Sequence, residues 1–215
     1  MKKNAIFFDF DGVILDSVHV KTKSFATIFK KYGPEIERQV VDYHIAHGGI
    51  SRFEKFRYFY ENLLQQPITS KQLIKLGEKF SSLTFSGVVD SHFIDGALET
   101  LEFLKKKNIL SFIVSGTPQT ELKEIVKIKK ISHYFAEIHG SPTTKYDIIQ
   151  HLITQFKLEN KRCLFIGDAM TDYDAALSVG IDFLGIVPPT TKSPFPNGTN
   201  HCTSLFFLQK MLNEA

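Results

Sequence analysis

The sequence predicts an α/β fold, in which a doubly wound parallel sheet carries an inserted domain of helices. Short apolar runs of strand length alternate with helical segments from about residue 91 onward, which favours a parallel sheet with helices on both faces. A block of purely helical pattern follows the first strand-like run and separates it from the rest of the sheet. We therefore expect an α/β core in residues 1–16 and 91–215 and a helical cap domain in residues 17–90.

The composition is that of an ordinary soluble globular protein. Of the 215 residues, 43% are hydrophobic and 23% are charged, and the net charge of +3 is too small and too evenly spread to indicate a nucleic-acid partner. The only cysteines, Cys163 and Cys202, lack the spacing of a zinc site. Asp9 and Asp11 interrupt the N-terminal apolar run, so it does not match a signal peptide, and no uncharged run is long enough to span a membrane. We expect a cytoplasmic protein without a membrane partner; the sequence does not indicate its oligomeric state.

The first strand-like run, Ala5 to Phe8, ends in two carboxylates. Side chains alternate along extended backbone, so Asp9 and Asp11 point to the same side, and Gly12 lets the chain turn directly after them. Two anions this close repel each other unless a cation or a shared proton lies between them. The stretch therefore indicates a divalent metal with chemistry on a carboxylate, although Asp residues also occur in ordinary turns at strand ends.

The block from Asp16 to about Asp90 is helical throughout. We expect a bundle of roughly four helices, the usual solution when apolar stripes are joined by short connections. Gly33-Pro34 ends the first helix, and a weaker helical segment spans Glu35 to His44. The apolar stripes are Phe25, Ile28, Phe29 and Tyr32; Phe53, Phe56, Phe59, Tyr60, Leu63 and Leu64; and Leu73, Leu76, Phe80 and Leu83.

The remaining core elements follow in alternation. Asp95-Gly96 starts a helix, and Thr117 and Pro118 are expected as the N-cap and first residue of another. Pro188 to Asn200 is expected to be a loop, followed by a closing helix near Leu205. The other predicted elements are strands at Ile109–Val114, Glu137–His139, Arg162–Ile166 and Ile181–Val187, and helices around Leu98–Leu104, Leu122–Val126 and Ile148–Phe156.

Polar groups cluster at the predicted carboxyl ends of the strands, where open α/β sheets bind ligands. Ser115 follows the second strand, Lys145 begins the helix after the third, and Asp168 and Asp172 follow the fourth. A phosphoryl group needs positioning and charge neutralisation, which a hydroxyl, a lysine and metal-binding carboxylates supply. Taken singly, Ser115 could be a turn hydroxyl, Lys145 a solvated lysine, and the two aspartates helix-capping residues. The inserted helices are placed as a lid over this edge.

Four segments in this order resemble the motifs of the haloacid dehalogenase superfamily of phosphohydrolases. They are DFDGVILDS at residues 9–17, VSGTP at residues 114–118, the isolated Lys145, and IGDAMTDYDAA at residues 166–176. The helical insertion is similar to the cap of the phosphoglycolate phosphatase and β-phosphoglucomutase branch. The resemblance implies a phosphatase acting on a small phosphorylated metabolite with Mg²⁺ as cofactor.

The resemblance also implies roles for the motif residues. Asp9 would be the nucleophile that forms an aspartyl-phosphate, and Asp11 would protonate the leaving oxygen and then activate water. Mg²⁺ would be held by Asp9, Asp168 and the backbone carbonyl of Asp11. The phosphate-binding residues would be Ser115, Gly116 and Lys145, and Asp172 would orient Lys145 or metal-bound water.

Three alternatives remain open. A dehalogenase would need no acid two residues after the nucleophile, and a phospho-receiver signalling domain would have no inserted cap. A sugar phosphomutase is the closest rival, because Gly49-Ile50-Ser51-Arg52 is similar to the cap loop of such mutases. The same segment also fits a capping box, with Ser51 and Glu54 bonding reciprocally.

The cap segment also supplies a hypothesis on specificity. Arg52 and Lys55 would face the cleft and contact a polar or anionic part of the substrate, because the loop from Gly48 to Ser51 can bend toward it. The alternative is that these two residues belong to a solvated basic helix face.

Overall fold

The computed structural model describes residues 3–214 and contains one parallel sheet in the order β3-β2-β1-β4-β5-β6. β1 lies in the middle, with β2 on one side and β4 on the other, in the register Phe7–Phe112 and Phe7–Phe165. The strands are β1 (Ala5–Phe8), β2 (Leu110–Pro118), β3 (Glu137–Ser141), β4 (Cys163–Gly167), β5 (Asp182–Ile186) and β6 (His201–Cys202).

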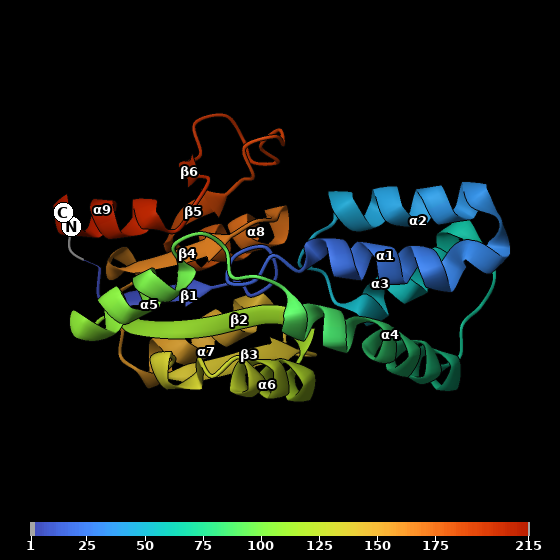
Figure 1. Ribbon diagram of the computed structural model, residues 1–215, viewed down its shortest axis with the longest axis horizontal. Helices are drawn as coiled ribbons and strands as arrows, with labels where there is room; N and C mark the ends of the chain where they lie inside the picture. Colours follow the sequence, from blue (N-terminus) through green and yellow to red (C-terminus); the bar gives the residue numbers. More distant parts are fainter. Residues whose placement is uncertain (1–2, 215) are drawn as a thin grey trace.

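Helices cover both faces of the sheet (Figure 1). The core helices are α5 (Ala97–Lys106), α6 (Gln119–Ile128), α7 (Lys145–Gln155), α8 (Met170–Val179) and α9 (Phe206–Glu214). Ile6 and Phe8 point to the face that packs against α5, α6 and α9, whereas Ala5 and Phe7 point to the face covered by α7 and α8. This alternation predicts that Asp9 points toward α7 and α8.

The remaining helices gather beyond the carboxyl end of β1 (Figure 1). They are α1 (Val18–Phe29), α2 (Pro34–Ala46), α3 (Arg52–Tyr58) and α4 (Ser70–Asp90), and α3 runs on into a π-helical turn at Phe59–Leu63. Their buried residues form a separate core rich in aromatic rings, in which Phe25 contacts Phe56, Phe59 and Phe80. We call these four helices the cap; the exact division at residues 16 and 91 stays a prediction.

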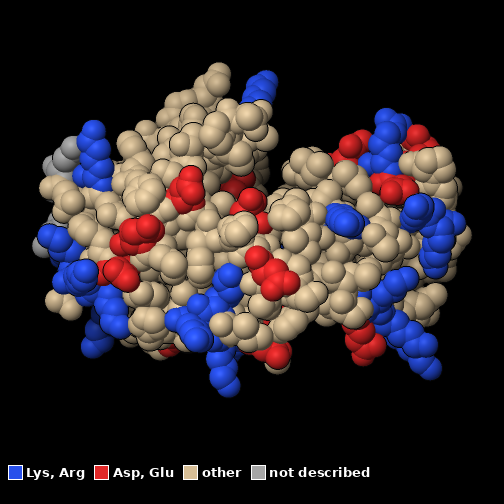
Figure 2. Space-filling view, in the orientation of Figure 1, with Lys and Arg blue, Asp and Glu red and all other residues tan. Residues whose placement is uncertain are grey.

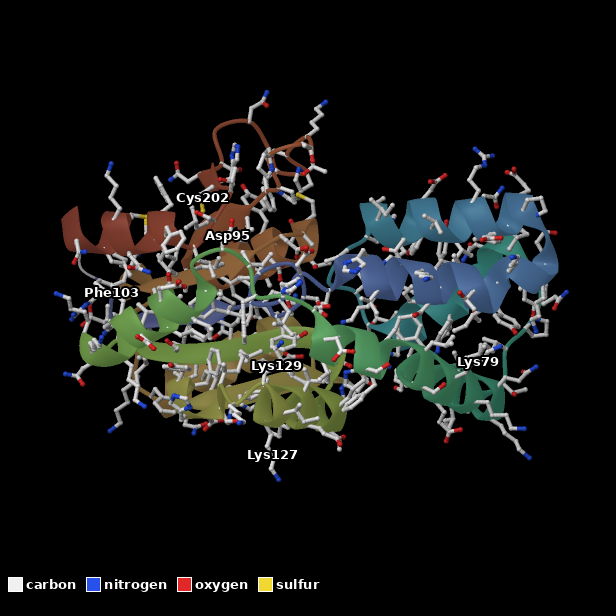
Figure 3. The ribbon with its side chains drawn as sticks, viewed as in Figure 1. Lys79, Asp95, Phe103, Lys127, Lys129 and Cys202 are labelled. Carbon is white, nitrogen blue, oxygen red and sulfur yellow. The ribbon has the colours of Figure 1, made fainter. Side chains whose placement is uncertain are left out.

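The two chain connections between cap and core lie side by side. The amide of Asp16 donates to the carbonyl of His92 at 2.9 Å, and that of Ile94 donates to Ile14 at 3.0 Å. Lys129, which follows α6, donates to the carbonyls of Val89 and Ser91 at 3.1 and 2.9 Å (Figure 3). A lysine of the core thus supplies hydrogen bonds to carbonyl groups at the C-terminal end of α4. These bonds fix where the cap meets the sheet.

Most predicted elements are present, and the differences have local causes. Thr117 and Pro118 are not the start of a helix: β2 continues to Pro118, which is itself the N-cap of α6, and Thr117 lies in the strand. Ser51 is the N-cap of α3, but its hydroxyl accepts from the amide of Phe53 and not from Glu54, so the expected capping box is wrong.

Smaller differences from the predictions concern the ends of strands and one of the apolar stripes in the cap. Leu83 is exposed, and Thr84 takes the buried position on that face of α4. Arg162 belongs to a short 3₁₀ turn before β4, and β6 was not predicted because it has only His201 and Cys202. Within residues 3–214, no helix is long and apolar enough to cross a bilayer, and the expected cytoplasmic location stays a prediction.

Candidate active site

Asp9 lies between a buried lysine and a buried carboxylate. As the alternation of β1 requires, it meets the first residue of α7: Lys145 Nζ lies 3.2 Å from Asp9 Oδ1 and donates to Asp172 Oδ1 on α8 at 2.5 Å. Asp172 is 0% exposed, and its other oxygen accepts from the amide of Ala169 at 3.2 Å. Burial alone would lower the pKa of Lys145, but Asp172 and Asp9 hold it above its ordinary value.

Asp168 completes an acidic group at the end of β4. Ligand oxygens of Asp9, Asp168 and Asp172 all lie within 4.8 Å of one another. Gly12 makes this approach possible, since its backbone has φ +84° and any Cβ atom there would overlap the carboxylate of Asp168. Position 12 therefore requires a glycine for two independent reasons, the positive φ and the closeness of the Asp168 carboxylate.

The acidic group carries more negative charge than the nearby lysine neutralises. Burial, together with the charges of Asp9 and Asp172, raises the pKa of Asp168 well above its ordinary value. Burial likewise raises the pKa of Asp172 to about 7, although Lys145 opposes the shift. Asp9 Oδ1 is buried and, apart from its ion pair with Lys145, makes no hydrogen bond within residues 3–214. An oxygen-only donor set with an unsatisfied carboxylate fits a hard divalent cation.

Asp11 lies apart from this group and is held by three side chains. Its carboxylate is paired with Lys21 on α1 and accepts from Ser17 Oγ at 2.6 Å and from Thr117 Oγ1 at 2.9 Å. Lys21 also donates to Thr117 Oγ1 at 2.7 Å. Burial raises the pKa of Asp11, but Lys21 and the two hydroxyls outweigh it, so the pKa is lower than usual. Asp11 is therefore ionised, and it is a candidate for a group that accepts and donates a proton.

Ser115 and Gly116 line the same cavity from β2. Ser115 is buried within the strand, not at its end, and its hydroxyl accepts from the amide of Thr117 at 3.2 Å. A side chain at Gly116 would overlap the carbonyl of Gly49 in the cap. Hence a serine hydroxyl and a bare backbone face the space above Asp9, as a bound oxyanion would require.

The cap reaches the core through its glycine loop. Thr171 Oγ1 donates to the carbonyl of Gly48 at 2.8 Å, and a Cβ atom at Gly49 would overlap the Thr171 hydroxyl and come within 3.2 Å of Lys145 Nζ. The loop between α2 and α3 therefore lies directly over the site, as the hypothesis on specificity assumed.

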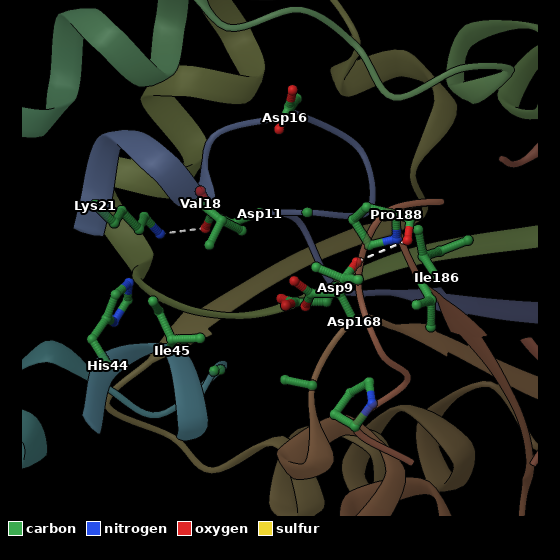
Figure 4. Close-up of a pocket in the computed structure, with 18 of the residues that line it drawn as sticks. Asp9, Asp11, Asp16, Val18, Lys21, His44, Ile45, Asp168, Ile186 and Pro188 are labelled. Carbon is green, nitrogen blue, oxygen red and sulfur yellow. Dashed lines mark hydrogen bonds and ion pairs between the residues drawn. The ribbon is translucent and has the colours of Figure 1, made fainter. Parts of the chain in front are cut away.

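A cavity of about 600 Å³ lies between the cap and the core. Figure 2 shows the molecular surface hollowed between the two parts, with acidic side chains at the edge of the hollow. In Figure 4, His44 and Ile45 of α2 enter from one side and Ile186 and Pro188 from the other, with Asp9 and Asp168 between them. The acidic group is thus at the floor of a cavity whose walls include apolar side chains.

Arg52 and Lys55 line this cavity but are only 5% and 2% exposed, so the solvated-face alternative is wrong. Arg52 makes a two-armed ion pair with Glu121 on α6, at 2.7 and 2.9 Å, and donates to Ser81 Oγ at 2.7 Å. Lys55 Nζ lies 2.7 Å from His44 Nδ1. The arginine thus bridges cap and core, and the lysine is paired within the cap.

Sequence reasoning missed the residues around Asp11. Ser17 and Lys21 are four positions apart, so they share one helix face directly after the acidic motif, and this spacing could have identified them. Thr117 was placed at a helix cap, which hid its contact with Asp11. Glu121 carries no sequence signal, because it meets Arg52 only through the docking of the cap on α6.

Comparison with known proteins relates the chain to one family. The model of the haloacid dehalogenase-like hydrolases matches residues 6–186. A phosphoglycolate phosphatase from Mannheimia succiniciproducens is 25% identical over 188 residues, which cover 84% of each chain. A 5'-nucleotidase from Pseudomonas aeruginosa is 25% identical over 189 residues, 84% of this chain and 81% of the other. The crystal structure of a β-phosphoglucomutase from Clostridium difficile superposes with a TM-score of 0.79 at 18% identity, over 99% of this chain and 98% of the other.

Proposed function

The chain belongs to the haloacid dehalogenase-like hydrolase family, and from this premise we propose that it hydrolyses a small phosphorylated metabolite through an aspartyl-phosphate on Asp9. It is an enzyme of the phosphatase type, in line with the relatives named phosphoglycolate phosphatase and 5'-nucleotidase. The observation that carries the mechanism is the pairing of buried Asp9 with Lys145 at the floor of a cavity that also holds Asp168.

In the first step, Asp9 attacks phosphorus, and the bond from phosphorus to the leaving oxygen breaks. Lys145 offsets the negative charge of Asp9 and of the phosphoryl oxygens, while the Ser115 hydroxyl and the amide of Gly116 hold those oxygens. Asp11, which has to take up a proton before this step, donates it to the leaving oxygen, so that the product leaves as an alcohol. Asp172 keeps Lys145 charged and in place, as its 2.5 Å contact supports.

In the second step, water attacks the phosphoryl group, and the bond to Asp9 breaks. Asp11, now ionised, takes the proton from that water. Lys21, Ser17 and Thr117 favour this ionised form, which supports the role of Asp11 as the base. The same contacts oppose protonation, so these neighbours set the balance between the two steps.

The residues fit a divalent cation, for which we propose Mg²⁺. Asp9 and Asp168 would hold it through carboxylate oxygens, and the backbone carbonyl of Asp11 would be a further ligand. The ion would neutralise charge on the phosphoryl oxygens. Its presence would also account for the buried Asp9 oxygen, which has an ion pair with Lys145 but no hydrogen bond among the described residues, and for the raised pKa of Asp168.

A sugar phosphomutase is the second candidate. The loop that contains Gly49, Ser51 and Arg52 lies over the site, as a loop that contacts a sugar phosphate would. Arg52 is, however, already paired with Glu121, which leaves less of its charge for a second phosphate. We retain the phosphatase as the preferred function.

The test is a panel of phosphate esters assayed with Mg²⁺ for phosphate release and, with sugar phosphates, for isomerisation. We expect phosphate release without isomerisation. Asp9→Asn should fold normally and lose at least about 10⁴-fold in turnover, since it lacks the nucleophile. Isomerisation faster than hydrolysis would favour the mutase, and near-normal turnover by Asp9→Asn would end the proposed mechanism.

We also propose that Arg52 and Lys55 contribute to substrate choice. Both line the cavity, and Arg52 joins the cap to α6. Arg52→Ala should raise the Michaelis constant of the preferred substrate; an unchanged constant would show that Arg52 has no part in binding.

A further inference from the structure

A polar pair is buried in the aromatic core of the cap. His44 on α2 and Lys55 on α3 are 6% and 2% exposed, and both line the cavity above Asp9. The ring of His44 packs 4.8 Å from that of Phe25, and Lys55 Nζ lies 5.8 Å from the same phenyl ring. Burying a lysine and a histidine among phenylalanines is costly unless they have partners.

The contact between the two side chains leaves a donor unused on each of them. Lys55 Nζ lies 2.7 Å from His44 Nδ1 and donates to the His44 carbonyl at 3.3 Å. An ammonium group only donates, so Nδ1 accepts, and the ring hydrogen is assigned to Nε2. His44 Nε2 is buried and has no hydrogen-bond partner among the described residues. A buried donor without an acceptor is destabilising, and an acceptor atom on a ligand would remove that cost.

Burial disfavours the charged form of both side chains. It lowers the pKa of His44 to about 3, with the nearby Lys55 adding to the shift, so the ring is neutral and its Nε2 hydrogen stays in place near neutral pH. Burial also lowers the pKa of Lys55 to about 7, with Lys21 adding to the shift. An anion beside Lys55 would favour its charged form and relieve this penalty.

Two other basic side chains of the cavity are already engaged, and a third, Lys192, is exposed. Lys21 is paired with Asp11, and Arg52 with Glu121. In Figure 4 the ring of His44 rises from α2 toward Lys21, and Asp9 and Asp168 lie to the side of it in the same cavity. Lys55 and His44 therefore present their unused donors to a molecule whose phosphoryl group lies at Asp9.

We propose that His44 Nε2 and Lys55 Nζ form a site on the cap for an oxyanion carried by the leaving group of the substrate. This inference rests on the proposed phosphatase function and names its substrate class: phosphate esters with a second anionic group, either a carboxylate or another phosphate. The phosphoryl group binds at Asp9, and the second anion binds at the cap.

The experiment compares matched ester pairs in the Mg²⁺-loaded enzyme. Phospholactate and isopropyl phosphate differ by a carboxylate; propanediol bisphosphate and propyl phosphate differ by a phosphate. We expect the wild-type enzyme to prefer the anionic member of at least one pair by about tenfold or more in kcat/KM, and the pair that shows the preference identifies the anion. Equal kcat/KM within both pairs would overturn the proposal.

The variants test the two donors separately. Lys55→Met keeps the length of the side chain in an apolar site and should reduce the preference ratio at least about tenfold. His44→Phe should reduce it as well, and His44→Gln, which places an amide donor near the position of Nε2, should restore part of it. Lys79→Met, an exposed lysine on α4, is the matched control and should leave the ratio unchanged. A ratio unaffected by Lys55→Met and His44→Phe would contradict the proposal.

Binding separates this proposal from the proposed function. Phosphonopropionate is not hydrolysed, so its binding can be measured by calorimetry. Its Kd for the wild-type enzyme should be at least about tenfold lower than its Kd for Lys55→Met. If no ester is hydrolysed but this difference is found, the phosphatase proposal fails and the cap site stands. If esters are hydrolysed and the two Kd values are equal, only the cap site fails.

Discussion

At the scale of single residues, the site is a set of buried charges whose neighbours decide their protonation. Asp11 and Asp168 are both carboxylates at strand ends, yet the pKa of Asp11 is lowered and that of Asp168 is raised. Lys21 and two hydroxyls surround Asp11, whereas Asp168 faces the charges of Asp9 and Asp172. This difference supports the proposed roles of Asp11 in proton transfer and of Asp168 as a metal ligand.

Lys21 provides a direct test of this division. Lys21→Met removes the positive charge beside Asp11, so the pKa of Asp11 should rise. Every limb of the pH–rate profile that reports Asp11 should then move to higher pH, and kcat should fall about tenfold to a hundredfold at neutral pH. Profiles of kcat and kcat/KM for the variant and the wild type check this. Superimposable profiles would mean that Lys21 does not control the pKa of Asp11.

His44 makes a prediction for stability. Its pKa is about 3 in the folded protein against an ordinary value of 6.5, so between these pH values the unfolded chain binds a proton that the folded chain does not. Stability is therefore lost as the pH falls through this range, by an upper limit on the order of 5 kcal/mol. Urea unfolding at several pH values should show a steeper acid loss for the wild type than for His44→Gln. Parallel curves would contradict the assignment.

At the scale of elements, the position of the cap depends on close contacts of its glycine loop. Gly49 has φ +75° and no room for a side chain beside Thr171 and Lys145, whereas Gly33, also in the cap, has φ +98° and no atom within 4 Å of the place that a Cβ atom would take. Both glycines have a positive φ, but they differ in their surroundings. Of the two, only Gly49 holds cap and core together.

Alanine at these two glycines separates backbone strain from cap docking. Both variants should lose roughly 1–2 kcal/mol of stability from the positive φ. Gly49→Ala should in addition lose about tenfold to a hundredfold in kcat/KM, because the cap is pushed away from the phosphoryl site. Gly33→Ala should keep wild-type kinetics. Equal kinetics in both variants would show that the loop contact is not needed for catalysis.

The elements also show what the sequence can and cannot predict. The spacing of apolar residues and the position of Gly and Pro residues identified β1, the four cap helices and the helices around the sheet, because apolar stripes depend only on local spacing. Thr117 was misplaced because a Thr-Pro pair resembles a helix start, and only the pairing of β2 with β3 as far as Pro118 shows that the strand continues. The contact of Arg52 with Glu121 depends on tertiary docking, which no local pattern encodes.

At the scale of the whole molecule, one edge of the sheet collects groups that are far apart in the chain. β1 and β4 are neighbours, so Asp9 and Asp168 meet, and α7 and α8 cover the face toward which Asp9 points. The order of the motifs therefore predicted that Asp9 and Asp168 lie close together, since carboxyl ends of parallel strands lie at one edge. Thr117 could be added only once the course of β2 was known.

The excess of buried negative charge predicts how the whole molecule responds to metal. Removal of divalent ions with a chelator should abolish phosphate release, and Mg²⁺ should restore it. Mg²⁺ should also raise the Tm of the wild-type protein, because an ion that binds only the folded state stabilises it. Asp168→Asn should lose this rise in Tm. An equal rise in the variant would place the metal elsewhere.

The most direct test of the central claim is the stereochemical course at phosphorus, measured with a phosphorothioate ester that two oxygen isotopes make chiral and that is hydrolysed in water of the third isotope. Transfer to Asp9 and then to water comprises two in-line displacements, so we expect the released thiophosphate to retain the configuration of the ester. Inversion would mean that water attacks the ester directly, and the aspartyl-phosphate on Asp9 would have to be abandoned.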